Sequence, residues 1–583
     1  MSFVHDPISL EILSNALRSI TDECFVALMK SAYSTNIKER HDHSTAIVDA
    51  EGRLIVQAKM SLPIHIATMM GTVQALIRLR RADIEEGDLY AANDPFVAGG
   101  SHLPDVNVTM PVFRDGKIVA FICNIAHHAD IGGMAAGSMA GGMTEVYQEG
   151  LRIPVVRLIN KGAVQNDILD LLLLNARVPN ERRGDYFAQF AAARLGVRRL
   201  QETLDRYGSD AILSAFDQII EKTESRLRAA VLTIPDGVYR FRDVMDDDGL
   251  AARNIPIVLA IHKTGDKLVF DFAGSSRQVP GNINMTLNGT VAAVSFALKS
   301  LLDPEIPNNE GVLRVVDVRA EKGLIVNAEF PAATAARLHT CQRVADVVFG
   351  ALASALPERV VAGGNGANTT AIFSGVDPRS GGPYVYLETL GGGAGGRFAR
   401  DGKDGVQVNL TNTSNLPVEA IELEYPLMVE GYGLVPDTGG AGRQRGGLAL
   451  CRIIRPVGHT CIFNGAGERF TNQPWGLLGG GPGATGSFKL IRRDGRSERL
   501  SNKPSGLSVG PDETVVVQTP GAGGYGPANE RSISELQRDL ESEKYSVAFI
   551  TEHYPDFVKT KMGEKLRPGA RNVEKITRQR QKR

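Results

Sequence analysis

The sequence of 583 residues has a formal net charge of −1, which excludes the basic excess typical of proteins that bind nucleic acid or acidic membrane surfaces. Its length exceeds one ordinary hydrophobic core and predicts about two to four domains. The five scattered cysteines form no C-x-x-C pair, and no apolar run approaches the ~18 residues of a membrane-spanning helix, so we expect a cytoplasmic protein with reduced thiols.

The N-terminal segment predicts a helix followed by a short hairpin. Asp6 matches a helix N-cap, and apolar residues then recur at spacings of three and four, which is typical of an amphipathic helix. Two strands are expected near 44–49 and 53–58, with Gly52 in the turn between them. Asp42 lies directly before the first of these strands.

A strong hairpin signal follows in the stretch 101–133. Asp115 and Gly116 lie between two apolar runs, and this pair predicts a two-residue type I′ turn. If Arg114 pairs with Lys117, the turn fixes the register of the whole hairpin, and therefore the residues that meet at its open end.

That register brings polar side chains together at the open end of the hairpin. It sets Asp105 opposite Ala126 and Pro104 opposite His127, and it brings His102 to the same end. Imidazole and carboxylate groups gathered in this way suit a divalent metal ion. Each histidine could instead be an ordinary hydrogen-bonded residue, and Asp105 could be a turn residue.

Further polar candidates lie in the same N-terminal part, whose first 128 residues hold seven of the eleven histidines. His128 points to the opposite face from His127 if the strand continues, so it is a candidate for acid–base chemistry or for holding the ligands in place. Asp130 could orient a ligating imidazole or form a turn. Glu145 follows a loop rich in glycine, methionine and alanine at 132–142, and it is a catalytic candidate with a structural alternative.

The rest of the chain predicts helices first and then mostly strands and turns. Residues 168–220 have a helical pattern with breaks near Pro179 and Gly208, and another helix is expected at 341–356. Glycine clusters beyond residue 360 keep no fixed period, so no repeat architecture is expected. We predict an α+β (mixed α/β), multi-domain fold with a glycine-rich, β-containing C-terminal half. The expected domains are an N-terminal metal-site domain (1–235), a β-rich domain (236–340), a glycine-rich α/β domain that faces a partner (341–530) and a charged helical tail with a basic end (531–583).

Several stretches, taken together, resemble one protein family. They are I-K-E-R-H-D-H-S (37–44), N-D-P-F (93–96), S-H-L-P-D (101–105), A-H-H-A-D-I-G-G (126–133), Y-Q-E-G-L-R-I-P (147–154), N-L-P-V-E-A-I-E (415–422), D-T-G-G-A-G-R-Q-R-G-G (437–447) and T-P-G-A-G-G-Y-G (519–526). Through these motifs the chain resembles the hydantoinase B family. That family comprises the B subunits of ATP-dependent hydantoinases and 5-oxoprolinases, with relatives in caprolactam hydrolysis and in acetone and acetophenone carboxylation.

The resemblance implies that this chain works with a larger A-type subunit, which binds ATP with Mg²⁺ and phosphorylates the carbonyl oxygen of the substrate. The sequence agrees with this division, since it contains no P-loop motif G-x-x-x-x-G-K-[ST]. The B-type subunit then completes the reaction at one divalent ion, zinc or manganese, and the matching ligand positions are Asp42, His102, Asp105 and His127. Asp42 could instead simply begin a strand. An assembly with two copies of each subunit (A2B2) is expected.

Three functions are compatible with these features. The first is the B-type subunit of an ATP-dependent cyclic amide or imide hydrolase, which opens hydantoin, N-methylhydantoin, 5-oxoproline or a lactam by hydrolysing the phosphorylated carbonyl with a metal-activated water. The alternative is a subunit of an ATP-dependent ketone carboxylase of the acetone or acetophenone type. The third is a non-catalytic scaffold, against which the clustered histidines and carboxylates argue. The catalytic candidates are His128, Asp130 and Glu145.

Overall fold

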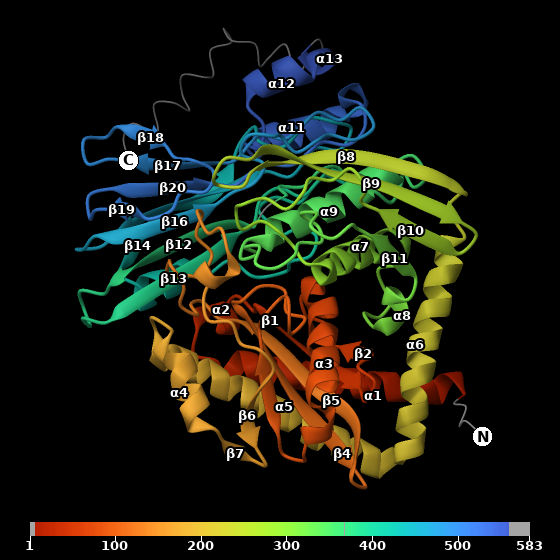
Figure 1. The fold of residues 1–583 in the computed structure, drawn as a ribbon. Helices are drawn as coiled ribbons and strands as arrows, with labels where there is room; N and C mark the ends of the chain where they lie inside the picture. The colour runs from red at the N-terminus through yellow and green to blue at the C-terminus, as the bar shows by residue number, and fades with distance from the viewer. Residues whose placement is uncertain (1–5, 367, 559–583) are drawn as a thin grey trace.

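The computed structural model describes residues 6–366 and 368–558, which form several sheets and helices (Figure 1). The predicted mixed α/β, multi-domain fold is confirmed. The N-terminal part is built on a seven-stranded sheet with the order β2-β1-β5-β4-β3-β6-β7. Its strands are β1 (His43–Asp49), β2 (Leu54–Gln57), β3 (Leu89–Ala92), β4 (Asp105–Arg114), β5 (Lys117–His127), β6 (Val156–Asn160) and β7 (Ala163–Val164).

The hairpin of β4 and β5 forms around the predicted turn. Asp115 and Gly116 have φ angles of 50° and 73°, the left-handed values that a type I′ turn requires. Next to the turn, Arg114 pairs with Lys117, as the sequence predicts. The local turn chemistry therefore determines this end of the hairpin.

A β-bulge changes the pairing further along the hairpin. Val119 is an extra residue between two consecutive pairs, so every later pair shifts by one. Asp105 therefore pairs with His127 rather than with Ala126, and the predicted register is wrong beyond the bulge. Residues that pair directly across two strands point to the same face of the sheet. The bulge thus places Asp105 and His127 on one face, where the predicted register would have separated them.

Helices cover both faces of this sheet, so all seven residues of β1 are buried. α1 (Pro7–Ser31) and α5 (Pro179–Tyr207) pack on one face, and Ile47 lies in the core between them and the sheet. α3 (Ile66–Arg80) packs on the other face, against Val48. These two consecutive residues lie in different cores because side chains alternate along a strand.

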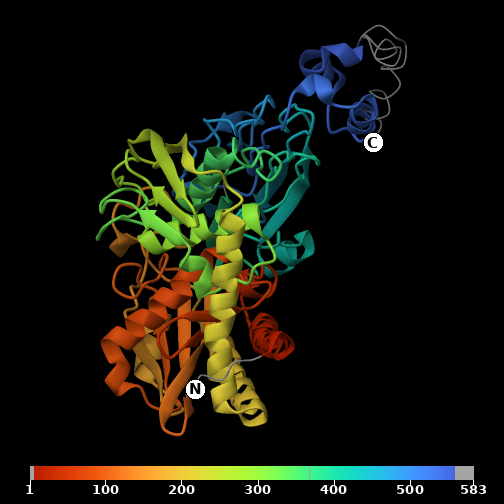
Figure 2. The same cartoon turned by 90° about the vertical axis from the view of Figure 1, so that its right-hand side faces the viewer.

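Helix α6 (Ser209–Val231) runs along one side of the molecule and leads to the second sheet (Figures 1 and 2). This sheet has the order β11-β10-β9-β8 and packs against α7 (Leu287–Leu302) and α9 (Arg337–Leu352). α9 begins earlier than the predicted 341, which places Arg337 on its first turn. The strands are β8 (Gly237–Asp247), β9 (Arg253–Thr264), β10 (Lys267–Asp271) and β11 (Val316–Arg319).

Two further sheets form the C-terminal half, with the orders β13-β12-β16-β19 and β14-β15-β20-β17-β18. Their strands are β12 (Thr369–Val376), β13 (Pro383–Leu390), β14 (Leu427–Val435), β15 (Ala449–Pro456), β16 (Cys461–Ala466), β17 (Ser487–Ile491), β18 (Ser497–Arg499), β19 (Leu507–Val509) and β20 (Thr514–Gln518). The glycine clusters serve close backbone packing: a Cβ atom on Gly447 would lie 1.9 Å from the carbonyl oxygen of Lys403. Close packing of this kind requires glycine at particular positions but no fixed period between the glycine clusters.

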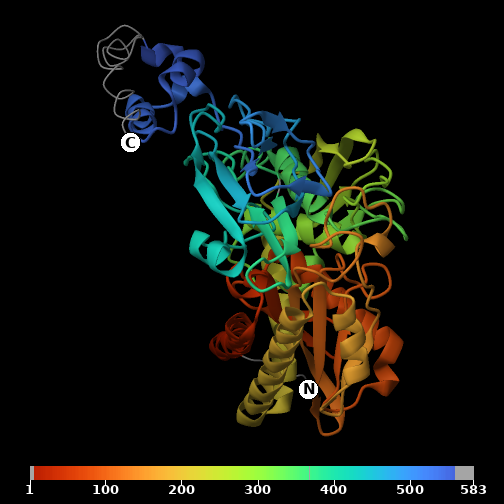
Figure 3. The ribbon, with the colours of Figure 1, turned by 90° about the vertical axis from the view of Figure 1, so that its left-hand side faces the viewer.

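Three C-terminal helices project from the body of the molecule (Figures 2 and 3), namely α11 (Ile533–Glu541), α12 (Val547–His553) and α13 (Pro555–Val558). The remaining α-helices of the described chain are short: α2 (Thr35–Lys38), α4 (Asn166–Leu174), α8 (Glu310–Leu313) and α10 (Val418–Glu424). The predicted basic end of the tail falls in residues 559–583, outside the described residues, and the domain boundaries stay predictions. Among the helices described, none combines the length and the apolar character that crossing a membrane requires.

Candidate metal centre

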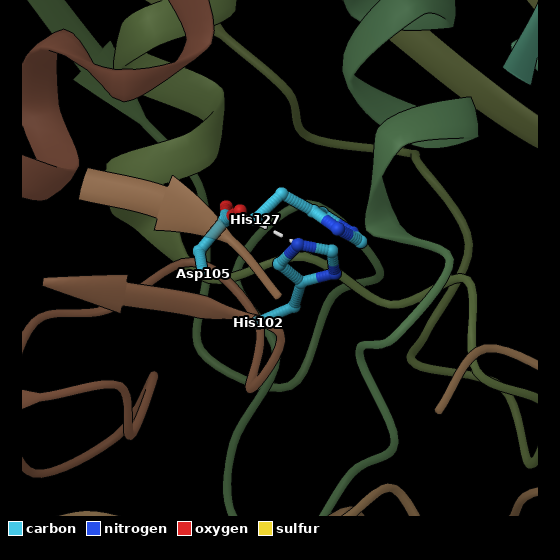
Figure 4. Close-up of side chains that lie close together, drawn as sticks. All are labelled: His102, Asp105 and His127. Carbon is cyan, nitrogen blue, oxygen red and sulfur yellow. Dashed lines mark ion pairs between the residues drawn. The ribbon is translucent and has the colours of Figure 1, made fainter. Parts of the chain in front are cut away.

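Three neighbouring strands of the first sheet, β1, β5 and β4, bring polar side chains to one end of the sheet. Asp105 is the first residue of β4 and faces His127, the last residue of β5, while His102 lies in the turn before β4. One ligand atom from each residue lies within 4.8 Å of the other two, and the three side chains point toward one another (Figure 4). All three residues are buried. The predicted convergence is therefore present, through the register that the bulge creates.

The hydrogen bond between His102 and the carbonyl of Ala335 determines which ring nitrogen of His102 carries the proton. Nδ1 is 2.7 Å from the carbonyl oxygen of Ala335, and since a carbonyl can only accept, Nδ1 carries the proton. Burial, together with the charge of Arg337, lowers the pKa of His102, so the ring is neutral and Nε2 holds a lone pair. Among the described residues this Nε2 has no hydrogen-bond partner, although it lies 3.2 Å from Oδ2 of Asp105. Two facing lone pairs favour a cation, so His102 fits a metal ion as it stands.

Asp105 is held as an anion. Its Oδ2 accepts hydrogen bonds from Nη2 of Arg337 at 2.6 Å and from Oγ of Ser101 at 2.7 Å. Burial alone would raise the pKa of this carboxyl, but the charge of the Arg337 guanidinium and the hydrogen bonds that Oδ2 accepts hold it well below its usual range. The other oxygen, Oδ1, finds no donor in the part of the chain that the structure describes. A buried carboxylate oxygen without a donor is costly, and a metal ion would satisfy it.

His127 is held in a different way. Its Nδ1 lies 2.9 Å from Nδ2 of Asn36, whose Oδ1 accepts a hydrogen bond from Nη1 of Arg40 at 2.6 Å. Because an arginine can only donate, it fixes the Asn36 amide with its NH₂ group toward His127. Nδ1 is therefore an acceptor, and the neutral ring carries its proton on Nε2. His102 and Asp105 fit a metal ion without change, whereas His127 fits one only when the proton leaves Nε2.

The hydrogen bond between Asn36 and His127 predicts that Asn36→Asp tightens the binding of Zn²⁺ by about tenfold. This is the lower end of the change in metal affinity that hydrogen-bond partners of metal ligands produce. A carboxylate at this position would accept from both Arg40 and Nδ1–H of His127, and would leave the lone pair of the ring on Nε2. Chelator competition measures the affinity. The matched control is Asn368→Asp, which adds the same charge at the cavity wall, where Asn368 bonds to Gln342 instead. Equal tightening in both variants would contradict the explanation.

Asp42 lies beside the cluster, immediately before β1. Its backbone carbonyl accepts from the backbone N–H of His127 at 3.0 Å, and it lines the same cavity as the cluster. Burial raises the pKa of Asp42 to about 7, and the charge of Asp105 adds to this increase while nearby arginines oppose it. Two carboxylates that repel each other in a buried site favour a cation. The structure thus brings all four predicted ligands to one cavity, with Asp42 outside the group of three whose ligand atoms lie within 4.8 Å.

The cavity at the cluster has a volume of about 30 Å³. That volume holds an ion with a water or two, since a single water needs only ~10–15 Å³ by the same measure. It is far below the ~300–1,000 Å³ that encloses a drug-sized ligand. Asn368 and Thr389 line it from the C-terminal half, so the cavity lies where the two halves of the chain meet.

Two ionisable residues of this cavity were not among the candidates from the sequence. His65, which precedes α3, has its Nε2 3.6 Å from Oδ2 of Asp105, and burial lowers the pKa of His65 to about 4. Arg337 lies 232 residues from Asp105, the carboxylate that it binds. The concentration of histidines in the N-terminal part could have indicated His65, whereas no sequence pattern indicated Arg337.

The catalytic candidate His128 lies outside the cluster. Its Nε2 bonds to Oε1 of Gln189 on α5 at 3.0 Å, and its ring packs against Tyr186 with 4.7 Å between the ring centroids. It therefore points to the opposite face from His127, as alternation along the strand predicts.

The other two catalytic candidates also have contacts elsewhere. Asp130 accepts from Nη1 of Arg177 at 2.9 Å and from backbone N–H groups of its own loop. Glu145 is exposed and caps the short 3-10 helix η3 (Val146–Gln148). The catalytic roles of all three candidates stay predictions.

Comparison with known proteins adds a second line of evidence. The chain is 37% identical over 547 residues to the uncharacterized protein MJ0963 of Methanocaldococcus jannaschii, a match that covers 93% of this chain and 94% of that protein. It is 32% identical over 564 residues to the putative B-type D-/L-hydantoinase subunit from Pseudomonas sp. (strain NS671), with 94% and 93% of the two chains covered.

Two solved structures have the same fold. The ATP-dependent caprolactamase from Pseudomonas jessenii matches with a TM-score of 0.89 and 29% identity, covering 95% of this chain and 96% of that chain. Nucleotide-free acetone carboxylase matches with a TM-score of 0.85 over 94% of this chain and 79% of that chain, and at 18% identity this likeness concerns the fold alone. The sequence pattern of Hydantoinase B/oxoprolinase matches residues 6–528, so the resemblance in the motifs is confirmed. On this evidence the chain belongs to the Hydantoinase B/oxoprolinase family.

Proposed function

We propose that this chain is the B-type subunit of an ATP-dependent hydrolase that opens a cyclic amide or imide, such as hydantoin, N-methylhydantoin, 5-oxoproline or a lactam. The observation that carries the proposal is the buried cluster of His102, Asp105 and His127. Within the described residues, Nε2 of His102 and Oδ1 of Asp105 lack the partners that buried polar atoms require. Membership of the family and the likeness to an ATP-dependent caprolactamase support the reaction class.

The chemistry of amides explains why two subunits would share the work. Nitrogen donation makes an amide carbonyl a poor electrophile, and phosphorylation of its oxygen by the partner would remove that donation. A divalent ion held by Asp42, His102, Asp105 and His127 would supply a water whose pKa is about 7 rather than ~15.7. Two imidazoles and two carboxylates suit zinc or manganese better than magnesium, which prefers oxygen ligands and retained waters.

The residues around the cluster would keep it ready for this task. The Ala335 carbonyl holds the proton of His102 on Nδ1, so Nε2 stays free as a ligand atom. Arg337 keeps Asp105 ionised and fixes the position of its Oδ2. Burial of the site would limit the access of bulk water, which protects a reactive phosphorylated intermediate.

The proposed partner is an A-type subunit that binds ATP and Mg²⁺, in an assembly with two copies of each chain. The similar hydantoinase protein is named as a B-type subunit, which supports a partner, as does the absence of a P-loop motif from the sequence. Co-expression of the two chains is expected to give one stable complex by light scattering after size-exclusion chromatography. Separate elution of the two chains would contradict this prediction.

The reaction is tested with the co-purified pair. ATP consumption and product formation are followed with hydantoin, 5-oxoproline, a lactam, and acetone or acetophenone with bicarbonate. Ring opening coupled to ATP hydrolysis is the expected result. ATP use with ketone and bicarbonate alone would instead identify the carboxylase alternative.

A further inference from the structure

Glu149 is a buried carboxyl group outside the proposed ligand set, and it is linked to that set through the backbone. Its relative exposure is 0%, and its Oε1 accepts hydrogen bonds from the backbone N–H groups of Thr334 and Ala335 at 2.5 and 2.7 Å. The carbonyl of the same Ala335 accepts from Nδ1 of His102. Two successive hydrogen bonds therefore connect Glu149 to a proposed metal ligand.

The segment that ends at Ala335 has no regular secondary structure and is held on one side by the segment of Glu149, while the backbone N–H of Ala336 bonds to the carbonyl of Asn282 at 2.9 Å. The backbone N–H of Val146 bonds to the carbonyl of Pro331 at 3.0 Å, and Glu145 forms an isolated bridge with Ala332. Residues 145–149 thus hold residues 331–335 along their length, and Glu149 binds the last two of them.

The segment of Glu149 is itself held in place by the backbone of residues 133–134. The backbone N–H of Met134 bonds to the carbonyl of Gln148 at 2.8 Å. A Cβ atom on Gly133 would lie 2.5 Å from that same carbonyl oxygen, so the two stretches of backbone are in close contact. The carboxyl group of Glu149 therefore occupies a fixed position relative to the end of the sheet.

We infer that Glu149 is a positioning residue of the metal centre, which fixes the Ala335 carbonyl and thereby holds the proton of His102 on Nδ1 and its lone pair toward Asp105. This inference rests on the proposed function, because it concerns the ion that the cluster would hold. Groups that hydrogen-bond to metal ligands typically change metal affinity by about 10–100-fold. A purely structural role would lower the stability of the chain and leave the metal affinity of the folded protein unchanged.

The decisive comparison is between Glu149→Ala and Glu149→Gln. The alanine variant leaves two buried N–H groups without their acceptor, so the Ala335 carbonyl keeps only the constraint from the bond between Ala336 and Asn282. We therefore expect Zn²⁺ affinity to fall about tenfold, the lower end of the range for groups that bind a metal ligand directly. Burial raises the pKa of Glu149 to about 8, so the carboxyl is mostly protonated at neutral pH and glutamine matches it in shape and charge. Glu149→Gln is therefore expected to retain affinity close to that of the unchanged chain.

Affinity is measured by chelator competition, and the visible absorption of bound Co²⁺ reports whether the ligands keep their geometry. The matched control is Asp88→Ala. Asp88 is also 0% exposed and accepts from two backbone N–H groups, those of Glu85 and Lys161, but it lies at the start of β3 away from the cavity. The Asp88→Ala variant should have a lower unfolding temperature than the unchanged chain and the same metal affinity. If Glu149→Ala does not fold, Glu149→Asp, which retracts the carboxyl by one methylene, replaces it with the same expected direction.

Unchanged metal affinity in the folded alanine or aspartate variant would overturn the inference, as would a loss in Glu149→Gln as large as in Glu149→Ala. Failure of the unchanged chain to bind any divalent ion is a different result. It would overturn the proposed metal function and this inference with it.

Discussion

Replacement of His102 by alanine is expected to weaken Zn²⁺ or Mn²⁺ binding by more than about 100-fold, beyond the range for residues that only support a ligand, and to abolish turnover. The reason is that His102 presents an unpaired Nε2 to Asp105 in a buried cavity. His127→Ala should have the same effect, since it removes the imidazole that faces Asp105 across the hairpin. Metal content after dialysis and chelator competition measure both losses.

His128→Ala is the matched control for these two variants. It removes a buried imidazole from the next position in the chain, and with it a hydrogen bond to Gln189, so its cost in stability is comparable at about 1–3 kcal/mol. It should keep the metal even if the rate falls, which also tests the catalytic role predicted for His128. Full metal occupancy in His127→Ala together with loss in His128→Ala would show that the register is shifted by one residue.

The chain without its partner is expected to open cyclic amides at least about 1,000-fold more slowly than the two-subunit mixture, a difference of ~4 kcal/mol in the barrier. The sequence contains no P-loop, and the cavity at the cluster has room for an ion rather than a nucleotide. The unphosphorylated amide would therefore remain a poor electrophile. ATP-dependent ring opening is measured at one concentration of this chain, with and without the partner.

The partner alone is the control for that comparison, because it would consume ATP without completing the reaction. A rate for the purified chain that equals the rate of the mixture would contradict the proposed division of labour. Metal content must be the same in both samples, so that the comparison changes only the partner.

The local sequence determined the hairpin on which the site is built. Asp115 and Gly116 specify a type I′ turn because both positions need positive φ, and the apolar runs on either side specify strands. Residues close to a tight turn are paired by it, so Arg114 and Lys117 meet as predicted. The sequence also placed the polar residues at the open end, where strand pairing was bound to gather them.

The local sequence could not determine the register beyond the bulge. β5 is apolar on both faces: Phe121 packs in the core with α3, and the next residue, Ile122, packs in the core with α1. A strand gives a clear register only where one face is polar, because a slip by one residue then exposes apolar groups. Because both faces of β5 are buried, a slip of the strand by one residue would expose no apolar side chain. The packing of the helices on the two faces therefore decides that Asp105 faces His127.

Tertiary structure alone supplied the groups that set the chemistry of the cluster. Arg337 keeps Asp105 ionised and fixes its position, although the two residues are 232 positions apart in the sequence. The carbonyl of Ala335 binds His102, which is 233 positions away in the sequence. Neither contact follows from spacing or periodicity, because both depend on how the middle of the chain packs over the end of the first sheet. The sequence thus determined which side chains could bind a metal, and the packing of distant segments decided their protonation and orientation, since a buried polar group takes its state from whichever partners the fold brings to it.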